Sequence, residues 1–471
     1  MPLILPGNVG SATAATGYDV DNSLRFNDGS SDALIRTLAD PGGAGNRNKW
    51  TFSTWLKRSA LGANQWIFGS YQSSNYSTAL LFKSDDTLQF FDYYNGSFNG
   101  QRRTNRVFRD ISAWYHIVAI WDKDNGTSDH KMRIYVNGTE ETSFSASSAP
   151  SNATTLNADG QDISIGQKEG VGDFFDGYMC ETVFNDGQAY TADNYGEFDS
   201  DSPNIWKPID VSGLNFGTTG FHLDYEDSSA LGNDVSGNNN DFTVNNLTSV
   251  DQSTDTCTNN SPTWNSLDNY YAESTFQEGN LEVRGKSPGV IYSYETYNIA
   301  TIGVSSGKWF WEVKLTNIDV GACQIGIVDN IPTSSGNQMG ARAYGYAYGN
   351  GGSVKNNGST LSGSYSSYTT GDIIGIALNL DDNELTFYKN GAVQNSGTAI
   401  SITAPASTTS GFYFPAGGDE NAGNNTLQAN FGSPPFSISS GNSDGNNYGN
   451  FEYSVPSGYY ALNTKNLAEF G

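Results

Sequence analysis

Carboxylate and imidazole side chains are the groups of this sequence that could carry acid–base chemistry. A glycoside hydrolase needs two carboxylates that face the scissile bond, about 5 Å apart for retention or about 6.5–9.5 Å apart for inversion. The nearest pair, Asp176 and Glu181 in FFDGYMCE, has an odd offset that directs the two side chains to opposite faces of a regular strand. The histidines, His116, His130 and His222, lack metal-ligand spacing, and no GxSxG elbow, Walker loop or Rossmann fingerprint occurs. We therefore expect no catalytic residue and no enzyme activity.

Oxygen-rich turns are the second kind of site that the sequence offers. DKDNGTSD supplies Asp122, Asp124 and Asp129 as hard oxygen donors for calcium, and DVSGNNND supplies a second set, Asp234, Asn238, Asn240 and Asp241. Both segments lack the bidentate glutamate and the flanking helices of an EF-type loop. Asp and Asn are also the ordinary residues of Asx-turns, so we favour turns here and keep calcium as the one cofactor to test.

Tyrosine-rich segments are the third kind of site. YQSSNYS (71–77) and FFDYYNGSFNGQRR (90–103) combine aromatic surface with hydrogen-bonding groups, as in carbohydrate or protein recognition. YGYAYGNGG (344–352) and SYSSYTT (364–370) are comparable. We expect ligand-binding loops with the contacts Tyr71, Tyr76, Tyr94, Arg102, Tyr346, Tyr348 and Tyr368. For Phe90 and Phe91 we favour strand positions that fill the core.

Length, charge and cysteine content limit the classes of protein. A chain of 471 residues exceeds what one core usually supports, which predicts two domains. The formal net charge of −26 excludes nucleic acid and anionic membranes as primary partners, because both would be repelled. Aromatic residues make up 13% of the chain, which is typical of many strands rather than of disorder. Cys180, Cys257 and Cys323 are odd in number and far apart, and they fit neither a disulfide framework nor a CxxC metal site.

Alternating apolar residues predict the strands that position these groups. Such runs occur in WYHIVAIW (114–121), KMRIYV (131–136), GKWFWEVKL (307–315) and GDIIGIALNL (371–380), and long helical periodicity is missing. In the last two runs the predicted buried face carries Trp309, Trp311, Val313, Leu315, Ile374, Ile376, Leu378 and Leu380, and the opposite face of the first of them carries Phe310, Glu312 and Lys314. In the first run His116 shares the presumed inward face with Trp114 and Val118, which indicates a hydrogen-bonded core histidine. Turn signals separate the runs at short intervals, as in antiparallel sandwiches. The predicted fold class is all-β.

The same hairpin is predicted twice. Asn137-Gly138 and Asn390-Gly391 each follow a strand, an acidic turn and a second strand. Asn-Gly is the preferred pair of a type I′ turn, because both central residues need a positive φ. We expect the same meander in two separate sandwiches.

Two segments resemble known domain families. Residues from about 305 to 432 resemble a SPRY domain, through GKWFWEVKL, QIGIVD, GDIIGIALNLDDNELTFYKNG and GFYFPAGG in this order. Residues from about 23 to 198 are similar to concanavalin A-like, laminin-G-type sandwiches, through SLRFNDG, WTFSTWLKRS, WYHIVAIW, MRIYVNG, ISIGQ and FFDGYMCETVFN. The laminarinase-like members of that fold carry Glu-x-Asp-x-Glu on one strand, a run that this chain lacks.

The resemblance implies two antiparallel jelly-roll-like sandwiches in tandem, joined by an irregular connector. The expected boundaries are an N-terminal arm at 1–22, a first sandwich at 23–205, the connector at 206–262, a SPRY-like sandwich at 263–437 and a C-terminal extension at 438–471.

The order of the segments is similar to tail-fibre-like or virion proteins of tailed bacteriophages, particularly marine ones. The opening MPLILPGNVGSAT, the connector DVSGNNNDF and the closing FEYSVPSGYYALNTKNL carry this resemblance. It implies location on the virion, other virion proteins as partners, a homo-oligomer in the particle, and binding of host-surface glycan or protein by sandwich loops. A purely structural spacer, adaptor or capsid decoration is the alternative, and a glycan-degrading enzyme is a remote one. We expect neither a signal peptide nor a transmembrane segment.

Overall fold

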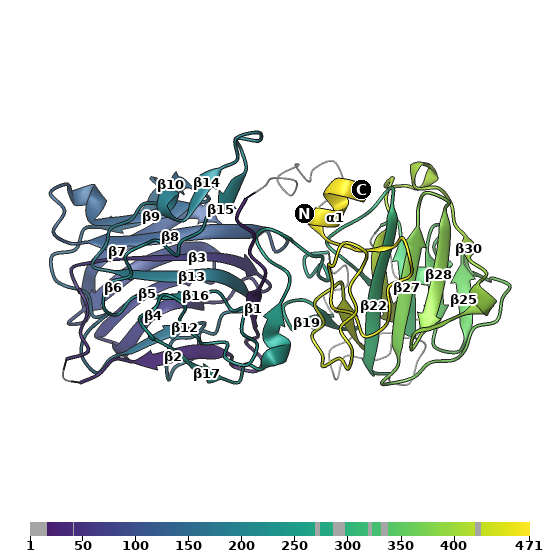
Figure 1. Cartoon of the computed structure of the whole chain (residues 1–471), viewed down its shortest axis with the longest axis horizontal. Coiled ribbons are helices and arrows are strands. Elements are labelled where there is room, and N and C mark those ends of the chain that lie inside the picture. The colour runs from purple at the N-terminus through teal and green to yellow at the C-terminus, as the bar shows by residue number, and fades with distance from the viewer. Residues whose placement is uncertain are drawn as a thin grey trace. The chain divides into compact units, whose positions relative to one another are not determined.

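The protein consists of two compact units (Figure 1). The computed structural model describes residues 17–40, 42–268, 274–285, 297–318, 323–330, 338–419 and 425–471. Within this range the first unit ends at Thr258 and the second begins at Asn259. Both are built from antiparallel sheets, and the described part contains one α-helix, α1 (Thr464–Phe470). The all-β prediction is confirmed.

The first unit is a sandwich of two sheets. One sheet has the order β10-β9-β8-β3-β13-β1-β18, with β16 paired to β13. Its strands are β1 (Ser23–Phe26), β3 (Lys49–Arg58), β8 (Trp114–Asp122), β9 (Met132–Val136), β10 (Thr139–Glu140), β13 (Gly177–Asp186), β16 (Phe221–Leu223) and β18 (Gln252–Ser253).

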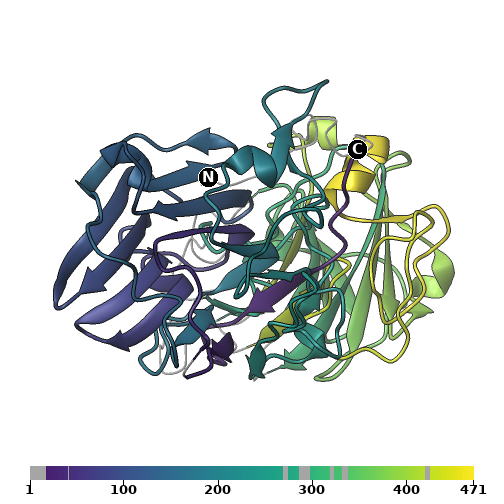
Figure 2. The same ribbon diagram turned by 60° about the vertical axis from the view of Figure 1, so that its left-hand side comes forward.

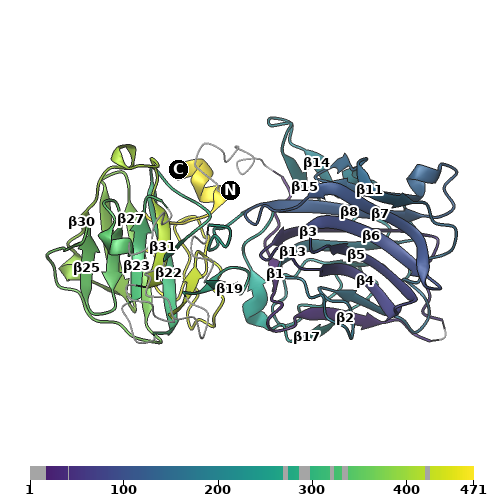
Figure 3. The same ribbon diagram turned by 180° about the vertical axis from the view of Figure 1, so that it is seen from behind.

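The second sheet of this unit has the order β11-β7-β6-β5-β4-β12-β2-β17. Its strands are β2 (Ala33–Thr37), β4 (Gln65–Ser73), β5 (Tyr76–Phe82), β6 (Thr87–Tyr94), β7 (Ser97–Val107), β11 (Phe144–Ser148), β12 (Asp162–Ile165) and β17 (Thr243–Asn245). Figure 3 shows β7, β6, β5 and β4 side by side.

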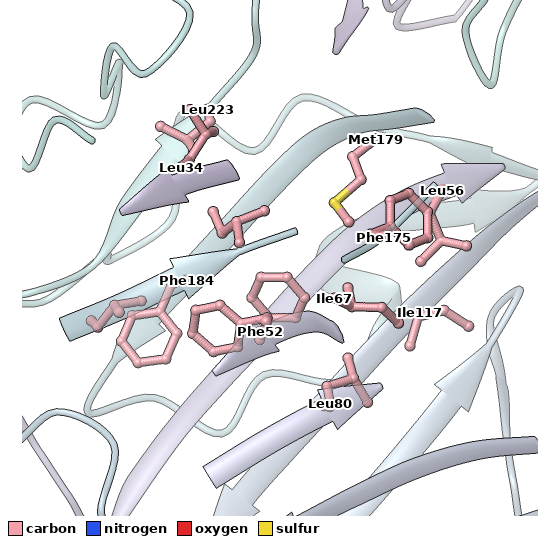
Figure 4. Packing of buried hydrophobic residues seen from close by; sticks show 14 of the residues in the cluster. Leu34, Phe52, Leu56, Ile67, Leu80, Ile117, Phe175, Met179, Phe184 and Leu223 are labelled. Atoms are coloured by element: carbon pink, nitrogen blue, oxygen red, sulfur yellow. The ribbon is translucent and has the colours of Figure 1, made fainter. Parts of the chain in front are cut away.

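Aromatic and aliphatic side chains fill the space between the two sheets (Figure 4). Phe52 of β3 stacks on Phe68 of β4, with ring centroids 4.1 Å apart. Trp50 meets Phe90 of β6 edge-on at 5.5 Å. Each pair joins one sheet to the other, so inward alternation on both sheets builds this core. Phe90 is therefore a core residue, as expected.

The outer face of the first sheet is also covered. Val118 and Ile120 of β8 pack against Tyr195 and Val211 from a segment that contains the hairpin β14 (Gly196–Phe198) and β15 (Trp206–Pro208). The expectation that the His116 face of β8 points into the sandwich is therefore wrong, because the alternate residues of β8 fill the sandwich core. Both faces of β8 are apolar because both are buried, and alternation alone could not tell them apart.

The segment expected as an irregular connector belongs largely to the first unit. Its short strands β16, β17 and β18 pair with β13, β2 and β1 respectively. Within it, Asp255 forms a buried ion pair with Lys57, with Nζ and Oδ2 2.9 Å apart. Strands of two or three residues carry no alternation, which is why the sequence did not reveal them.

The second unit is also built from two sheets. The larger one has the order β19-β20-β32-β22-β27-β28-β29, with β30 on β28 and β33 on β22. Its strands are β19 (Thr275–Gln277), β20 (Glu282–Arg284), β22 (Lys308–Asn317), β27 (Ile373–Asn379), β28 (Glu384–Lys389), β29 (Ala392–Val393), β30 (Ile400–Ser401), β32 (Thr426–Asn430) and β33 (Tyr460–Ala461).

The smaller sheet has the order β21-β31-β23-β24-β25-β26. Its strands are β21 (Tyr297–Ile299), β23 (Cys323–Val328), β24 (Tyr346–Gly349), β25 (Ser353–Asn356), β26 (Ser359–Thr360) and β31 (Phe414–Asp419). The predicted inward residues of β22 and β27 lie in the core of this unit, namely Trp309, Trp311, Val313, Leu315, Ile374, Ile376 and Leu378.

The C-terminal extension folds onto the larger sheet of the second unit (Figure 2). Phe310, on the opposite face of β22 from Trp309, packs with Phe451 and Ala461. The parallel pairing of β33 with β22 fixes the same segment. The extension therefore covers a face that would otherwise expose apolar residues.

The two predicted Asn-Gly turns have nearly identical geometry. Asn137 and Asn390 both have φ 48°, and Gly138 and Gly391 both have φ 77°. The side-chain oxygen of Asn137 accepts the His116 N–H at 2.7 Å, and that of Asn390 accepts the Ile373 N–H at 2.8 Å. In each unit the Asn thus binds the start of the neighbouring strand, so the local sequence produces the same corner twice.

Candidate functional site

The hairpin of β6 and β7 carries exposed aromatic side chains. Its turn, Asn95-Gly96, has φ 52° and 76°, the two positive values of a type I′ turn. The N–H of Gly96 donates to the Asn75 carbonyl at 3.1 Å, which ties this turn to the turn between β4 and β5. Tyr94 and Phe98, on either side of the turn, are each 42% exposed. The hairpin is therefore held firmly while it presents apolar surface to solvent.

Five aromatic side chains at this hairpin form two groups, and the rings within each group are in contact. Tyr93 and Phe98 lie 4.4 Å apart between centroids, and Phe91 meets both rings edge-on at 5.4 and 5.8 Å. Tyr76, at the start of β5, meets Tyr94 edge-on at 5.6 Å. Side chains alternate along β6, so Tyr93 and Tyr94 place the two groups on opposite faces of the hairpin. We call the five residues together the aromatic surface. Rigid aromatic rings beside polar turn residues are typical of recognition surfaces for sugars and proteins.

A pocket of about 300 Å³ opens where the edge strands of the two sheets, β10 and β11, approach each other. Arg102 of β7 is 3% exposed and donates to Ser147 Oγ at 2.6 Å. Its carboxylate neighbour is Asp129, 3.9 Å away and 93% exposed, so the ion pair compensates little of the buried charge. Burial lowers the pKa of Arg102, but a guanidinium stays protonated at neutral pH.

The other groups of this pocket supply both donors and acceptors. Arg133 Nη1 donates to the Tyr135 hydroxyl at 3.0 Å, and that hydroxyl donates to Glu140 Oε2 at 2.9 Å. Within the described part of the chain, the buried Nε of Arg133 has no hydrogen-bond partner. Phe144 lies under the Arg102 guanidinium, with 5.5 Å between the guanidinium carbon and the ring centroid. The set suits a polyhydroxylated ligand, whose hydroxyls both donate and accept.

A buried histidine joins β8 to the β14–β15 hairpin. Trp206 Nε1 donates to His116 Nδ1 at 2.9 Å, so the proton of the ring sits on Nε2 and is donated to Ser53 Oγ at 2.8 Å. Burial lowers the pKa of His116 to about 3. His116 is therefore a neutral structural residue, as the sequence indicated, although it lies on the outer face of its sheet.

A second buried polar group surrounds Glu181, which sits in a bulge of β13 with φ 49°. Its carboxylate is 3.0 Å from His222 Nε2 and accepts from the Tyr18 hydroxyl at 3.4 Å. The sequence argument for Asp176 and Glu181 assumed a regular strand, and the bulge between Cys180 and Val183 breaks that regularity.

The predicted ligand contacts of the first unit fall into the two regions described above. Tyr76 and Tyr94 belong to the aromatic surface, and Arg102 lines the pocket. Tyr71 adjoins the aromatic surface, because it packs in the same small cluster as Phe91. The Lys168 ammonium lies over the Tyr71 ring, 4.5 Å from its centroid. Phe91 itself lies in that satellite cluster and is only partly buried, so the expectation that it fills the core is wrong.

The predicted contacts of the second unit are core residues, which corrects the sequence interpretation. Tyr346, Tyr348 and Tyr368 are at most 4% exposed and pack in the core of this unit. The Tyr368 hydroxyl donates to the Cys323 and Tyr348 carbonyls at 3.1 and 2.8 Å. A buried tyrosine whose hydroxyl is satisfied by main-chain groups looks the same in sequence as an exposed one.

The calcium candidates do not converge. Asp122 lies 3.6 Å from Lys49, Asp124 pairs with Lys123, and Asp129 pairs with Arg102. In the described ranges no group of three or more His, Cys, Asp or Glu side chains could hold a metal ion.

The second oxygen-rich segment is a set of turns, as favoured from the sequence. The carboxylate of Asp234 accepts the N–H groups of His222, Ser236 and Asn240 at 2.8–2.9 Å. Asp241 Oδ1 accepts the Asp234 N–H. These carboxylates therefore satisfy the main-chain hydrogen-bond donors around them.

Among the described residues no helix is both long and apolar enough to cross a membrane. Residues 28–194 match the model of the concanavalin A-like lectin/glucanases superfamily, and residues 308–434 match the SPRY domain model. No curated protein matches the chain.

Several solved structures are similar to parts of the chain. The SPRY domain of human HERC1 is 18% identical over 31% of this chain and 86% of its own, with a TM-score of 0.25. The native heptameric SAP-like pentraxin of Limulus polyphemus is 20% identical over 37% of this chain and 80% of its own, with a TM-score of 0.28. A Bacteroides ovatus protein to which carbohydrate binding is attributed is 19% identical over 48% of this chain and 59% of its own, with a TM-score of 0.35. The family models show that the chain carries a concanavalin A-like domain of the laminin G type in its first unit and a SPRY domain in its second.

Proposed function

We propose that this protein is a structural component of a bacteriophage virion, a tail fibre or similar appendage, that binds glycan or protein on the host surface. The aromatic surface of the β6–β7 hairpin is the observation that carries the binding part of this proposal. A soluble domain rarely exposes contacting aromatic rings unless a partner covers them. The similarity of the segment order to tail-fibre-like proteins supports the virion part. We expect other virion proteins as partners and a homo-oligomer in the particle.

The pocket around Arg102 supports glycan as the ligand class. Its guanidinium groups and carboxylates can bind sugar hydroxyls, and Phe144 and Met132 supply apolar surface beside them. A volume of about 300 Å³ lies at the lower end of the range for small-molecule sites. One sugar unit of a longer chain would fill such a pocket, while the aromatic surface would receive the flanking part or a second chain.

A purely structural role is the second candidate, and the second unit favours it. In the described ranges three aromatic side chains are largely exposed, and all three lie in the first unit: Tyr94, Phe98 and Phe198. Among the described residues of the second unit the large exposed hydrophobic side chains are the aliphatic Leu267 and Val393. This unit has the features of a spacer or docking module, even if the first unit binds the host.

Adsorption to cells tests the proposal. Purified full-length protein is incubated with intact cells of a susceptible host and, separately, with an array of bacterial surface polysaccharides. We expect binding in both assays. The double substitution Tyr94→Ala with Phe98→Ala should weaken it at least about tenfold, since exposed aromatic anchors often contribute 1.4 kcal/mol or more. Phe198→Ala removes an equally exposed aromatic ring elsewhere on the first unit and should leave binding unchanged.

Two further readouts separate the alternatives. Arg102→Gln should reduce binding to polysaccharide if a sugar enters the pocket, and it should leave binding unchanged if the receptor is a protein held by the aromatic surface alone. Release of reducing sugar from a bound polysaccharide would instead support the remote enzymatic alternative. A chain that ignores cells and polysaccharides but still joins its virion neighbour would refute host binding and establish the structural role.

A further inference from the structure

Two of the three cysteines meet in the first unit, although 77 positions separate them in sequence. The Sγ atoms of Cys180 and Cys257 are 3.6 Å apart, and both thiols are free. Cys180 belongs to β13 and is fully buried. Cys257 lies in the turn that follows β18 and is partly exposed. No local pattern in the sequence indicates this pair, because spacing alone does not reveal contacts made by the fold.

The main chain holds the two sulfurs at this distance. Asp255, two residues before Cys257, forms the buried ion pair with Lys57 and accepts from Trp114 Nε1 at 3.2 Å. Thr258, directly after Cys257, exchanges hydrogen bonds with the main chain of Val20, both at 3.1 Å. Cys257 is therefore fixed on both sides. Closing a disulfide needs an S–S distance of about 2.05 Å, so the sulfurs must approach by about 1.5 Å through rotation of the two side chains.

We propose that Cys180 and Cys257 are a site of oxidative modification that closes to an intramolecular disulfide in an oxidising environment. The bond fastens the turn at 255–258 covalently to β13. This inference does not depend on the proposed host-binding function. It agrees with a protein that is made in a reducing cytosol and acts outside the cell, where disulfides persist.

The exchange proceeds in two balanced steps with a small disulfide, such as oxidised glutathione, as the oxidant. The Cys257 thiol, the less buried of the two, loses its proton and attacks one sulfur of the reagent, which forms a mixed disulfide and releases one glutathione thiolate. The Cys180 thiol then loses its proton and attacks the Cys257 sulfur, which releases the second glutathione. Two protein thiols are oxidised, and one reagent disulfide is reduced to two thiols.

The burial of the pair sets the rate. Burial and the neighbouring Cys180 raise the pKa of the Cys257 thiol well above its ordinary value. Because the thiolate is the nucleophile, oxidation should be slow at pH 7 and faster at higher pH. Cys323 in the second unit is fully buried as well and serves as an internal reference, since it lies on β23 outside this pair.

Thiol counting by mass spectrometry tests the site. The folded full-length protein is incubated with oxidised glutathione at pH 8, unfolded, and alkylated. We expect the wild type to lose two hydrogen atoms and to take up one alkyl group, at Cys323. Cys257→Ser should lose none and take up two alkyl groups, whereas Cys323→Ser should lose two and take up none. Peptide mapping of the wild type should yield a cross-linked peptide pair containing Cys180 and Cys257.

Thermal unfolding tests the consequence. Oxidation should raise the Tm of the first unit by roughly 5–10 °C, because the disulfide restricts the unfolded chain over a long loop. Cys257→Ser should show no difference between oxidising and reducing conditions. Three alkyl groups on the oxidised wild type, or glutathione that remains on Cys257, would overturn the proposal. A cross-linked protein with an unchanged Tm would refute the stabilising role of the bond.

Discussion

His116 and His222 show that burial alone does not decide the charge of a side chain. Both are buried in the first unit, and burial opposes the charged form of each. Around His116 no charge offsets this effect, so its pKa falls to about 3. At His222 the hydrogen bond and the charge of Glu181 outweigh burial, and the pKa is raised above its ordinary value. The same residue type is thus held neutral in one place, while its charged form is favoured in another.

An NMR titration of the histidine rings should separate the two. We expect His222 to titrate above pH 6.5 and His116 to remain neutral down to pH 4. Glu181→Gln should lower the pKa of His222, because burial is then opposed only by the charges of Asp224 and Asp234. Ser53→Ala touches only the His116 network and should leave the His222 titration unchanged. A His116 that titrates near pH 6.5 would contradict the buried, neutral assignment.

The two shifts act on stability in opposite pH ranges. The folded pKa of His116 lies below its unfolded value of about 6.5, so the unfolded chain binds the proton first as the pH falls. The free energy of unfolding therefore decreases between pH 6.5 and about 3, by about 1.4 kcal/mol per pH unit. The folded pKa of His222 is raised, so its contribution to the free energy of unfolding is complete below pH 6.5. This contribution is lost as the pH rises through the folded pKa.

At the scale of elements, one carboxylate connects β22 to the C-terminal extension. Glu312 is fully buried and accepts the N–H groups of Glu452 and Tyr453 at 3.0 and 2.9 Å. Asn430 Nδ2 donates to it at 3.0 Å. The sequence placed Glu312 on the exposed face of its strand. The extension covers that face. Its main-chain N–H groups do not pair with a strand there, so they need a side-chain acceptor, which Glu312 supplies.

The pH dependence of Glu312 provides a test of this contact. Burial raises the pKa of Glu312 to about 7 despite these hydrogen bonds, against an unfolded value of 4.5. The contribution of Glu312 to the free energy of unfolding is therefore complete below pH 4.5 and is lost as the pH rises through 7. The measurement is urea unfolding of the second unit. Between pH 4.5 and pH 8, the free energy of unfolding of Glu312→Gln should rise by about 3 kcal/mol relative to that of the wild type. A difference that does not change with pH would contradict the raised pKa.

At the scale of the whole molecule, the chain divides after Thr258, near the end of the segment 206–262 that was expected as the connector. The concanavalin A-like match ends at residue 194, yet β16, β17 and β18 still belong to the first sandwich. Each unit has its own aromatic and aliphatic core. A core of its own is the physical condition for a unit that folds alone.

Truncation should reveal this boundary. We expect residues 1–258 and 259–471, produced separately, each to give a cooperative unfolding transition and a near-UV circular dichroism spectrum of a packed core. Residues 1–205, cut at the end of the first sandwich that the family resemblance implies, should fail to do so. This fragment lacks Asp255 and His222, so Lys57 and Glu181 would be left as buried charges without these partners. A stable fragment 1–205 would show that the later strands are dispensable.

The sequence by itself determined the long alternating strands, the inward residues of β22 and β27, and the two Asn-Gly turns. These depend on local chemistry, namely side-chain alternation with a period of two and the positive φ that Asn and Gly accept. Only the tertiary structure decided which apolar face is covered and by what. It buried Tyr348 and left Tyr94 exposed, covered Glu312, and brought Cys180 to Cys257. Alternation specifies the side of a strand on which a residue lies, but the cover over that side comes from distant segments whose contacts no local pattern records.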